Sequence, residues 1–190
     1  MKSDQRDREE LLEILKKKSY REGKVVLASG KESDFYIDCR QTSLSARGHL
    51  LVGKLFFQLI QEHFPSARGV GGPTLGADPL ISAVSLISAL EEKPLDGFIV
   101  RKEPKGHGTG AWIEGLSNLG PGSPVVLLED VITTGGSSQK AIARAEEAGL
   151  KVLGLVVLVD RREGGREAIE KQGVALVSLF TRNDFIADRV

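Results

Sequence analysis

The chain has few of the features that mark secreted or membrane proteins. Its 190 residues contain one cysteine, Cys39, so no disulfide can form within the chain. No apolar run reaches the roughly 20 residues that a membrane-spanning helix needs. The segment Met1–Glu10 is charged and unlike the apolar core of a signal peptide. These absences predict a cytoplasmic protein that has no membrane partner.

An excess of charge of either sign is also missing, because 26 Lys and Arg residues balance 26 Asp and Glu residues. Without a strong basic field to attract phosphate backbones, we predict no nucleic-acid partner. Apolar residues make up 41% of the chain, which is enough for a substantial core. Since no repeat or low-complexity tract interrupts it, we predict one domain over residues 1–190.

Two common nucleotide-binding motifs are absent: G-x-x-x-x-G-K-[ST], and G-x-G-x-x-G after a strand. What is present is an alternation of helical and apolar extended segments. Helices are predicted at 4–18, 46–63, 75–90 and 136–148, and strands at 68–71, 98–100, 124–129, 152–159 and 174–179. Two short extended pieces, near 24–28 and 34–38, come before most of this pattern. Strands that are apolar on both faces and alternate with helices predict an α/β fold, with a mostly parallel sheet between layers of helices.

The segment Val125–Ser137 carries the clearest chemistry. It places Glu129 and Asp130 at the end of an apolar strand and follows them with Thr133–Ser137 before a helix. Ligands of parallel sheets bind at this end of the strands, and glycine-rich turns before helices bind anions through backbone N–H groups. An ordinary capped helix would explain Gly135 and Ser137 but not two acids on a buried strand. The segment therefore predicts a ribose phosphate site.

A second feature lies between two predicted strands, where Arg101, Lys102, Lys105 and His107 occur within seven residues. Such a cluster suits a polyanion, for example a departing diphosphate. The glycines at 106, 108 and 110 would let the segment close over the site and exclude water. The alternative is a solvated basic loop without a ligand. Either way, the long stretch 101–122 is expected to be a loop.

The residues E-D-V-I-T-T-G-G-S resemble the phosphoribosyl diphosphate signature of the type I phosphoribosyltransferases. The resemblance implies that Glu129 and Asp130 contact the ribose hydroxyls and that the following loop holds the 5′-phosphate. The donor-binding residues implied in this segment are Glu129, Asp130, Val131, Ile132, Thr133, Thr134, Gly135, Gly136 and Ser137.

Three further segments resemble the orotate phosphoribosyltransferases in particular. Arg101–Gly108 is similar to their catalytic loop, Leu27–Arg40 to their N-terminal hood, and Val159–Gly165 to their D-R-x-E-G turn. The resemblance implies the type I fold with a hood over about residues 1–40. It also implies that Arg161 and Thr133 bind orotate, whose carboxylate suits a guanidinium. Alternatively, Arg161 forms only a surface ion pair with Asp160 or Glu163.

The activity implied is transfer of a phosphoribosyl group from 5-phosphoribosyl 1-diphosphate to orotate, giving orotidine 5′-monophosphate and diphosphate in pyrimidine synthesis. Lys105, His107 and Asp130 are the implied catalytic residues, and Arg101, Lys102, Lys105 and His107 the implied diphosphate ligands. The cofactor would be Mg²⁺, with no metal ligand supplied directly by the protein. The family also implies a homodimer in which the catalytic loop is shared between subunits.

Some positions leave the interpretation open. Ala28 and Leu75 stand where some family members have lysine near the ligand, although Gly71–Thr74 still resembles a diphosphate loop that uses backbone amides. Phe35 or Tyr36 belongs to the hood core or contacts orotate, and Trp112 belongs to the lid or to a dimer contact. The alternative functions are a purine or xanthine phosphoribosyltransferase, and a regulator of this fold that binds nucleic acid.

Overall fold

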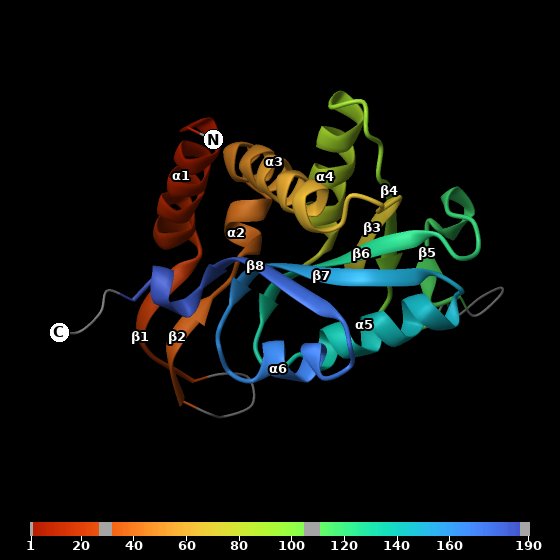
Figure 1. Ribbon diagram of the computed structural model, residues 1–190. Helices are drawn as coiled ribbons and strands as arrows, with labels where there is room; N and C mark the ends of the chain where they lie inside the picture. Colours follow the sequence, from red (N-terminus) through yellow and green to blue (C-terminus); the bar gives the residue numbers. More distant parts are fainter. Residues whose placement is uncertain (1, 27–31, 105–110, 187–190) are drawn as a thin grey trace.

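A six-stranded sheet forms the centre of the computed structural model, which describes residues 2–26, 32–104 and 111–186 (Figure 1). The strand order is β5-β4-β3-β6-β7-β8. Neighbouring strands run parallel, except that β5 is antiparallel to β4. The strands are β3 Gly69–Pro73, β4 Asp96–Val100, β5 Ile113–Glu114, β6 Pro124–Ile132, β7 Lys151–Asp160 and β8 Ala175–Thr181. The predicted mostly parallel sheet is confirmed.

Helices cover both faces of this sheet. One face carries α3 Ala46–His63 and α4 Asp78–Leu90, and the other carries α5 Gly136–Glu147 and α6 Gly165–Glu170 (Figure 1). Because successive strand residues point to opposite faces, Val126 and Leu128 join the core beneath α3 and α4. Val125 and Leu127 join the core against α5 and α6. Two apolar cores therefore hold β6, which carries both acids, in the middle of the molecule.

The N-terminal part of the chain forms the hood at one end of the sheet (Figure 1). It consists of α1 Lys2–Lys18, the antiparallel pair β1 Tyr20–Val26 and β2 Glu32–Ile37, and the short helix α2 Arg40–Ser43. The other end of the described chain packs against it, because Phe185 contacts the ring of Phe35 at a centroid distance of 5.8 Å. The predicted hood is confirmed, but it contains C-terminal residues as well.

Several element boundaries differ from those predicted. Strand β3 runs to Pro73 through residues predicted as a loop, and α4 begins at Asp78 instead of Leu75. Strand β6 pairs with β3 only as far as Leu127, but it continues beside β7 to Ile132. Its two acids therefore lie where β6 projects beyond β3, three and two residues before its own end.

The stretch 101–122 was predicted as a loop, and this was partly wrong. Val100 pairs with Ile113, and the N–H of Arg101 donates to the carbonyl of Trp112 at 2.9 Å, so β4 and β5 form a hairpin. A 3₁₀ turn at Leu116–Asn118 follows. Burial of Ile113 explains why this short strand forms. The helices α2 and α6 were also missed.

Candidate functional site

The two acids of β6 have different surroundings. Glu129 is buried, and its Oε2 accepts hydrogen bonds from the hydroxyls of Ser137 at 3.0 Å and Ser138 at 2.8 Å. Asp130 is partly exposed, and its Oδ1 accepts from the backbone N–H of Val131 at 2.9 Å. Glu129 is thus tied to the first turn of α5, while Asp130 faces the open end of the sheet.

Burial sets the acidity of this pair. It raises the pKa of Glu129 to about 7, with a further contribution from the charge of Asp130 and partial opposition from the two serine hydroxyls. Burial also raises the pKa of Asp130, while the N–H of Val131 and the charge of Arg40 partly lower it. Near neutral pH, the pair therefore binds a proton more readily than two exposed carboxylates would, and hydroxyl donors or cations favour its ionised form.

The turn from β6 to α5 has the geometry that an anion site requires. Gly135 is the N-cap residue of α5 and has a φ of 83°, which a glycine adopts without strain. Thr134, Gly136 and Ser137 are exposed, and Thr133 is partly buried. The first backbone N–H groups of α5 therefore lie at an exposed helix N-terminus, directly after two threonines.

The segment between β3 and α4 packs directly against Asp130. A Cβ atom added to Gly76 would collide with the Asp130 carboxylate, so only glycine fits here without movement. The hydroxyl of Thr74 donates to Oδ2 of Asp78 at 2.7 Å and fixes the turn. The predicted diphosphate loop and the predicted ribose acid are therefore neighbours, although the chain separates them by more than fifty residues.

Only part of the predicted cationic loop is described. The Nη1 of Arg101 forms an ion pair with Oε1 of Glu114 at 3.1 Å, and Lys102 is exposed. Lys105 and His107 lie outside the described residues, as does Ala28. The part that is described begins at the carboxyl end of β4, beside β3 and its diphosphate loop.

A second charged cluster joins the hood to the sheet. Arg161 is 8% exposed, and its guanidinium lies 5.5 Å from the ring centre of the buried Phe35. Arg182 lies 5.7 Å from the same ring. Glu163 is 2.8 Å from Nη2 of Arg161 and 4.0 Å from Nη1 of Arg182. Arg161 thus forms the predicted pair with Glu163, but it is buried against an aromatic ring and is not a surface residue.

One backbone hydrogen bond connects this cluster to the phosphate loop. The N–H of Arg161 donates to the carbonyl of Ile132 at 3.1 Å, directly before Thr133. The carboxylate of Asp160 accepts from the N–H of Arg162 at 2.8 Å and from Nε of Arg166 at 3.0 Å, which holds the turn in shape. Arg161 and Thr133, both predicted to bind orotate, are therefore brought together by paired strands.

Some predicted residues have a narrower range of roles than the motif suggested. The side chain of Ile132 is buried in the core beneath α5, so only its backbone faces the site. Val131 packs at the edge of the other core. Phe35 is fully buried between Tyr20 and Phe185 and belongs to the hood core, whereas Tyr36 is partly exposed. Trp112 lies under the guanidinium of Arg144, with Cζ 3.8 Å from the ring centre.

Other residues of the site were missed. Ser138 was overlooked because the motif was read only to Ser137, although a second serine follows directly. Arg40 acts on Asp130 through its charge while its Nε donates to Asp38 at 2.8 Å. Arg182 reaches the cluster from beyond β8, and no local sequence signal marks it.

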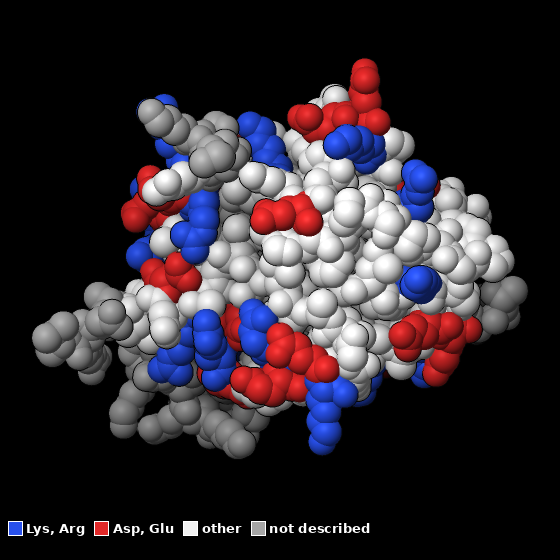
Figure 2. All heavy atoms as spheres, in the orientation of Figure 1, with Lys and Arg blue, Asp and Glu red and all other residues white. Residues whose placement is uncertain are grey.

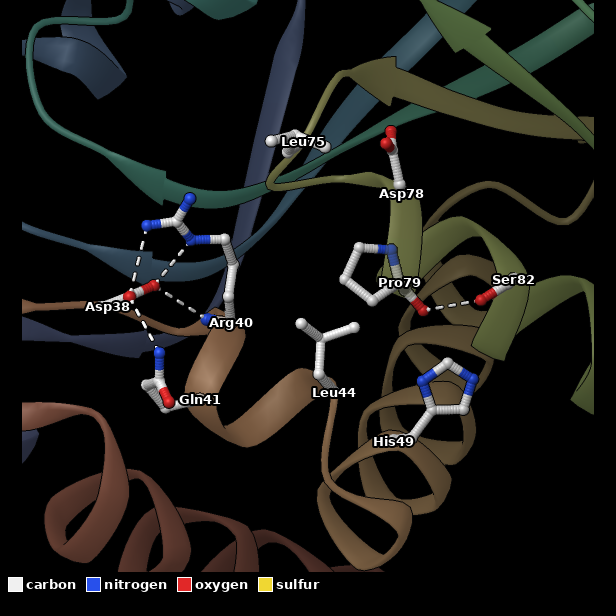
Figure 3. Close-up of a pocket in the computed structure, with 9 residues that line it drawn as sticks. All are labelled: Asp38, Arg40, Gln41, Leu44, His49, Leu75, Asp78, Pro79 and Ser82. Atoms are coloured by element: carbon white, nitrogen blue, oxygen red, sulfur yellow. Dashed lines mark hydrogen bonds and ion pairs between the residues drawn. The ribbon is translucent and has the colours of Figure 1, made fainter.

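Two hollows lie on either side of the turn at 73–78. The first, of about 670 Å³, is shown in Figure 3. It is lined by Asp38, Arg40, Gln41, Leu44, His49, Leu75, Asp78, Pro79 and Ser82. The second, of about 630 Å³, is lined by Pro73, Thr74, Gly76, Val100, Arg101, Lys102, Trp112, Glu129, Ser137, Lys140, Ala141 and Arg144. The second hollow thus adjoins both predicted phosphate-binding segments.

The face seen in Figure 2 carries Lys and Arg side chains interleaved with Asp and Glu, around a broad uncharged area. It shows no continuous basic surface. Within the described ranges, no group of three or more His, Cys, Asp or Glu side chains has the arrangement of a metal site. In the same ranges, no helix is long and apolar enough to cross a membrane.

Comparison with known proteins adds independent findings. A family model described as a phosphoribosyl transferase domain matches residues 49–182. The orotate phosphoribosyltransferase of Sorangium cellulosum (strain So ce56) is 50% identical over 182 residues, which are 96% of this chain and 94% of the relative. The family match begins within α3 and ends beyond β8, so it includes all strands of the central sheet.

Solved structures agree with this result. The crystal structure of Mycobacterium tuberculosis H37Rv orotate phosphoribosyltransferase in complex with Fe(III) dicitrate has a TM-score of 0.82 and 37% identity. The same enzyme in complex with 5-phospho-α-D-ribosyl 1-diphosphate has a TM-score of 0.79 and 35% identity. Each comparison covers 94% of this chain and 98% of the other. The likeness therefore includes the hood as well as the sheet.

Proposed function

This chain belongs to the orotate phosphoribosyltransferase family and has the type I phosphoribosyltransferase fold, and on that basis we propose its reaction. It transfers the phosphoribosyl group of 5-phosphoribosyl 1-diphosphate to orotate and releases orotidine 5′-monophosphate and diphosphate. This is a pentosyltransferase step of pyrimidine nucleotide synthesis.

The observation that carries the proposal is the contact between the phosphate loop and the turn that contains Arg161. The backbone hydrogen bond from Arg161 to Ile132 holds residue 161 beside the first residue of the phosphate loop, and the Arg161 side chain is buried. A donor held by Asp130 and by Thr133–Ser137 would therefore have its ribose next to a group that binds carboxylates. Orotate differs from uracil by that carboxylate, which supports orotate as the acceptor.

The chemistry follows from this placement. A ring nitrogen of orotate attacks C1 of the ribose while the bond to diphosphate breaks, and the sugar ring becomes positively charged. Asp130 and Glu129 orient the ribose hydroxyls, and Arg101 and Lys102 bind the departing diphosphate. Catalysis of this kind rests on positioning and on stabilisation of the leaving group. We assign Lys105 and His107 the same role, or proton delivery, from the family resemblance.

Mg²⁺ fits this site as a companion of the donor. It is commonly bound through one or two carboxylates together with substrate phosphates, and it neutralises their charge. Asp130 supplies a carboxylate that is partly exposed and faces the diphosphate loop at Gly76. In this proposal the donor phosphates hold the ion, and the protein orients the donor that carries it.

We further propose that two copies associate through a leucine stripe, defined by Leu44, Leu75, Leu86 and Leu90. Each is 57–72% exposed, and Leu86 and Leu90 continue along α4 from the wall of the first hollow. Contiguous exposed apolar side chains favour a protein contact. The stripe adjoins the diphosphate loop, so a partner bound there would lie next to the donor site and its loop could be shared.

Sedimentation velocity tests this association. Leu86→Glu should shift the protein towards the monomer, because burying a carboxylate at an interface is costly. Gln172→Glu adds the same charge at an exposed position beyond α6 and should leave the dimer intact. Equal dimer populations for both variants would contradict the stripe as the interface.

The proposed cytoplasmic location, without nucleic-acid or membrane partners, rests on the sequence. The one cysteine, Cys39, is fully buried, and burial raises the pKa of its thiol, which keeps it protonated.

A substrate panel tests the activity. Purified protein, Mg²⁺ and 5-phosphoribosyl 1-diphosphate are mixed in separate reactions with orotate, uracil, adenine, hypoxanthine or xanthine. Consumption of orotate alone, followed by its absorbance, is expected. Turnover of a purine would support the purine or xanthine enzyme instead. Turnover of none, with the donor still bound, would favour a regulator.

A further inference from the structure

The second hollow contains cations that the proposed mechanism does not use. Its walls come from the diphosphate loop at 73–76, from the β4–β5 hairpin, and from α5. Arg101 and Lys102 belong to the hairpin and were expected from the sequence. Lys140 and Arg144 belong to α5, and neither the motif nor the mechanism above accounts for them.

The α5 residues of this hollow form one face of the helix. Ser137, Lys140, Ala141 and Arg144 are spaced by three, one and three residues, so they lie along a single stripe. Ser137 donates to Glu129, which directs this stripe towards the carboxyl end of β6. Helical side chains also lean towards the N-terminus, so Lys140 is directed back towards the first turn of α5.

Two of the four cations are already engaged. Arg101 pairs with Glu114 at 3.1 Å, and Arg144 pairs with Glu147 and covers Trp112. Over the described ranges, no carboxylate forms an ion pair with Lys102 or Lys140. These two lysines therefore have charge available for an anionic ligand.

The turn at 73–77 supplies no cation to this hollow. Leu75 stands where some family members have lysine, and its side chain lines the first hollow instead of the second. The diphosphate loop thus has backbone amides for an anion but no charged side chain of its own, and the hydroxyl of Thr74 already donates to Asp78. A cation from another element would compensate for this lack.

We propose that Lys140 binds the diphosphate, both of the donor and as the released product, and supplies the positive charge that Leu75 does not. This inference rests on the proposed function. It assigns to α5 a second contact with the donor, one helical turn beyond the phosphate loop. Because the lysine is exposed, its contribution is moderate, on the order of a tenfold change in affinity.

The lining of the hollow favours the diphosphate over the 5′-phosphate. Pro73, Thr74 and Gly76 of the diphosphate loop line it together with Lys140. Of the phosphate loop, Ser137 lines it, whereas Thr133 and Gly135 do not. In this proposal the amides at the start of α5 bind the 5′-phosphate, while Lys140 shares its cavity with the diphosphate loop.

Calorimetric titration with two probes tests this assignment. Inorganic diphosphate with Mg²⁺ reports on the diphosphate subsite, and ribose 5-phosphate reports on the 5′-phosphate subsite. Lys140→Gln should raise the Kd of diphosphate, and the KM of the donor, about tenfold. It should leave the Kd of ribose 5-phosphate and the KM of orotate within about twofold.

Lys151→Gln is the matched control, because Lys151 is exposed at the start of β7, at the amino end of the parallel strands and away from the site. It should change neither probe. Unchanged diphosphate binding in Lys140→Gln, or a larger loss for ribose 5-phosphate, would overturn the inference alone. A native protein that binds no diphosphate and turns over no orotate would instead overturn the proposed function, and the inference with it.

Discussion

The donor side and the acceptor side of the site are assembled in opposite ways. The donor residues assigned to the ribose and the 5′-phosphate, 129–137, are consecutive and are held by one strand and the helix that follows it. The acceptor side combines Phe35, Arg161 and Arg182, which come from three distant segments. A consecutive loop takes its shape from local backbone geometry, whereas an assembled cluster exists only when distant elements pack. The two sides should therefore respond differently to substitution.

The largest effect is expected at Arg161, on the acceptor side. Arg161→Gln removes a buried charge that we assign to the orotate carboxylate, so kcat/KM for orotate should fall about 100-fold, equivalent to about 3 kcal/mol. The KM of the donor should stay nearly constant. Arg162→Gln, at the exposed neighbour, is the control. A fall in donor affinity of the same size would show that the two sides are not separable.

On the donor side, the burial of Glu129 should make the stability of the protein depend on pH. The folded pKa of Glu129, about 7, lies above the value of 4.5 expected in the unfolded chain, so the folded state holds a proton that the unfolded chain releases. Stability is therefore undiminished below about pH 4.5 and decreases as the pH rises to about 7, by on the order of 3 kcal/mol. Glu129→Gln should lack this loss.

Urea unfolding of both proteins between pH 4.5 and 8 measures this difference. The variant should gain stability relative to the native protein as the pH rises, and Glu167→Gln, on the exposed face of α6, should not. A difference that stays constant with pH would mean that Glu129 titrates normally and that its burial has no electrostatic consequence.

Gly76 tests whether the diphosphate loop positions Asp130 in the consecutive donor segment 129–137. Gly76→Ala places a methyl group against Asp130, so the carboxylate or the turn must move. We expect kcat/KM for the donor to fall about tenfold, about 1.4 kcal/mol, with the KM of orotate little changed. Gly120→Ala adds a methyl group that meets nothing closer than the Ser123 hydroxyl, at 4.0 Å, and serves as the control. Equal activity of the two variants would show that the diphosphate loop does not constrain Asp130.

The smallest effect is expected at Asp184, far from the chemistry. Its carboxylate accepts from the N–H and hydroxyl of Thr181 and pairs with Arg8 at 3.0 Å. Asp184→Asn should reduce the free energy of unfolding by about 1 kcal/mol through the weakened cap. It should raise the KM of orotate slightly and leave that of the donor unchanged. Thermal unfolding and steady-state kinetics measure the two effects.

The donor side was the more predictable half for a physical reason. Val125–Ser137 carries its strand, its acids and its glycine turn in one segment, and α3 was predicted with its observed ends, Ala46 and His63. Periodicity and turn chemistry act over short distances, so the sequence displays them directly. Assigning the acceptor required the family resemblance, because nothing local to Arg161 indicates what it faces.

Long-range packing accounts for what was missed. Burial of Glu129 depends on Ser138 and on both cores, and the raised pKa follows from that burial. The contact of Gly76 with Asp130, and that of Arg182 with Phe35, join residues whose proximity only the folded chain creates. The short strand β5 was missed because two residues carry too little pattern to be recognised.

The ion pair between Arg8 and Asp184 has a consequence for folding during synthesis on the ribosome. The two side chains are 176 positions apart, and Phe185 completes the aromatic packing around Phe35. The N-terminal part of a chain leaves the ribosome first, and domains fold as their segments become available. Strands β3 and β6 and helix α5 emerge well before residue 184. We therefore expect the sugar-phosphate site of a nascent chain to form before its site for the base is complete.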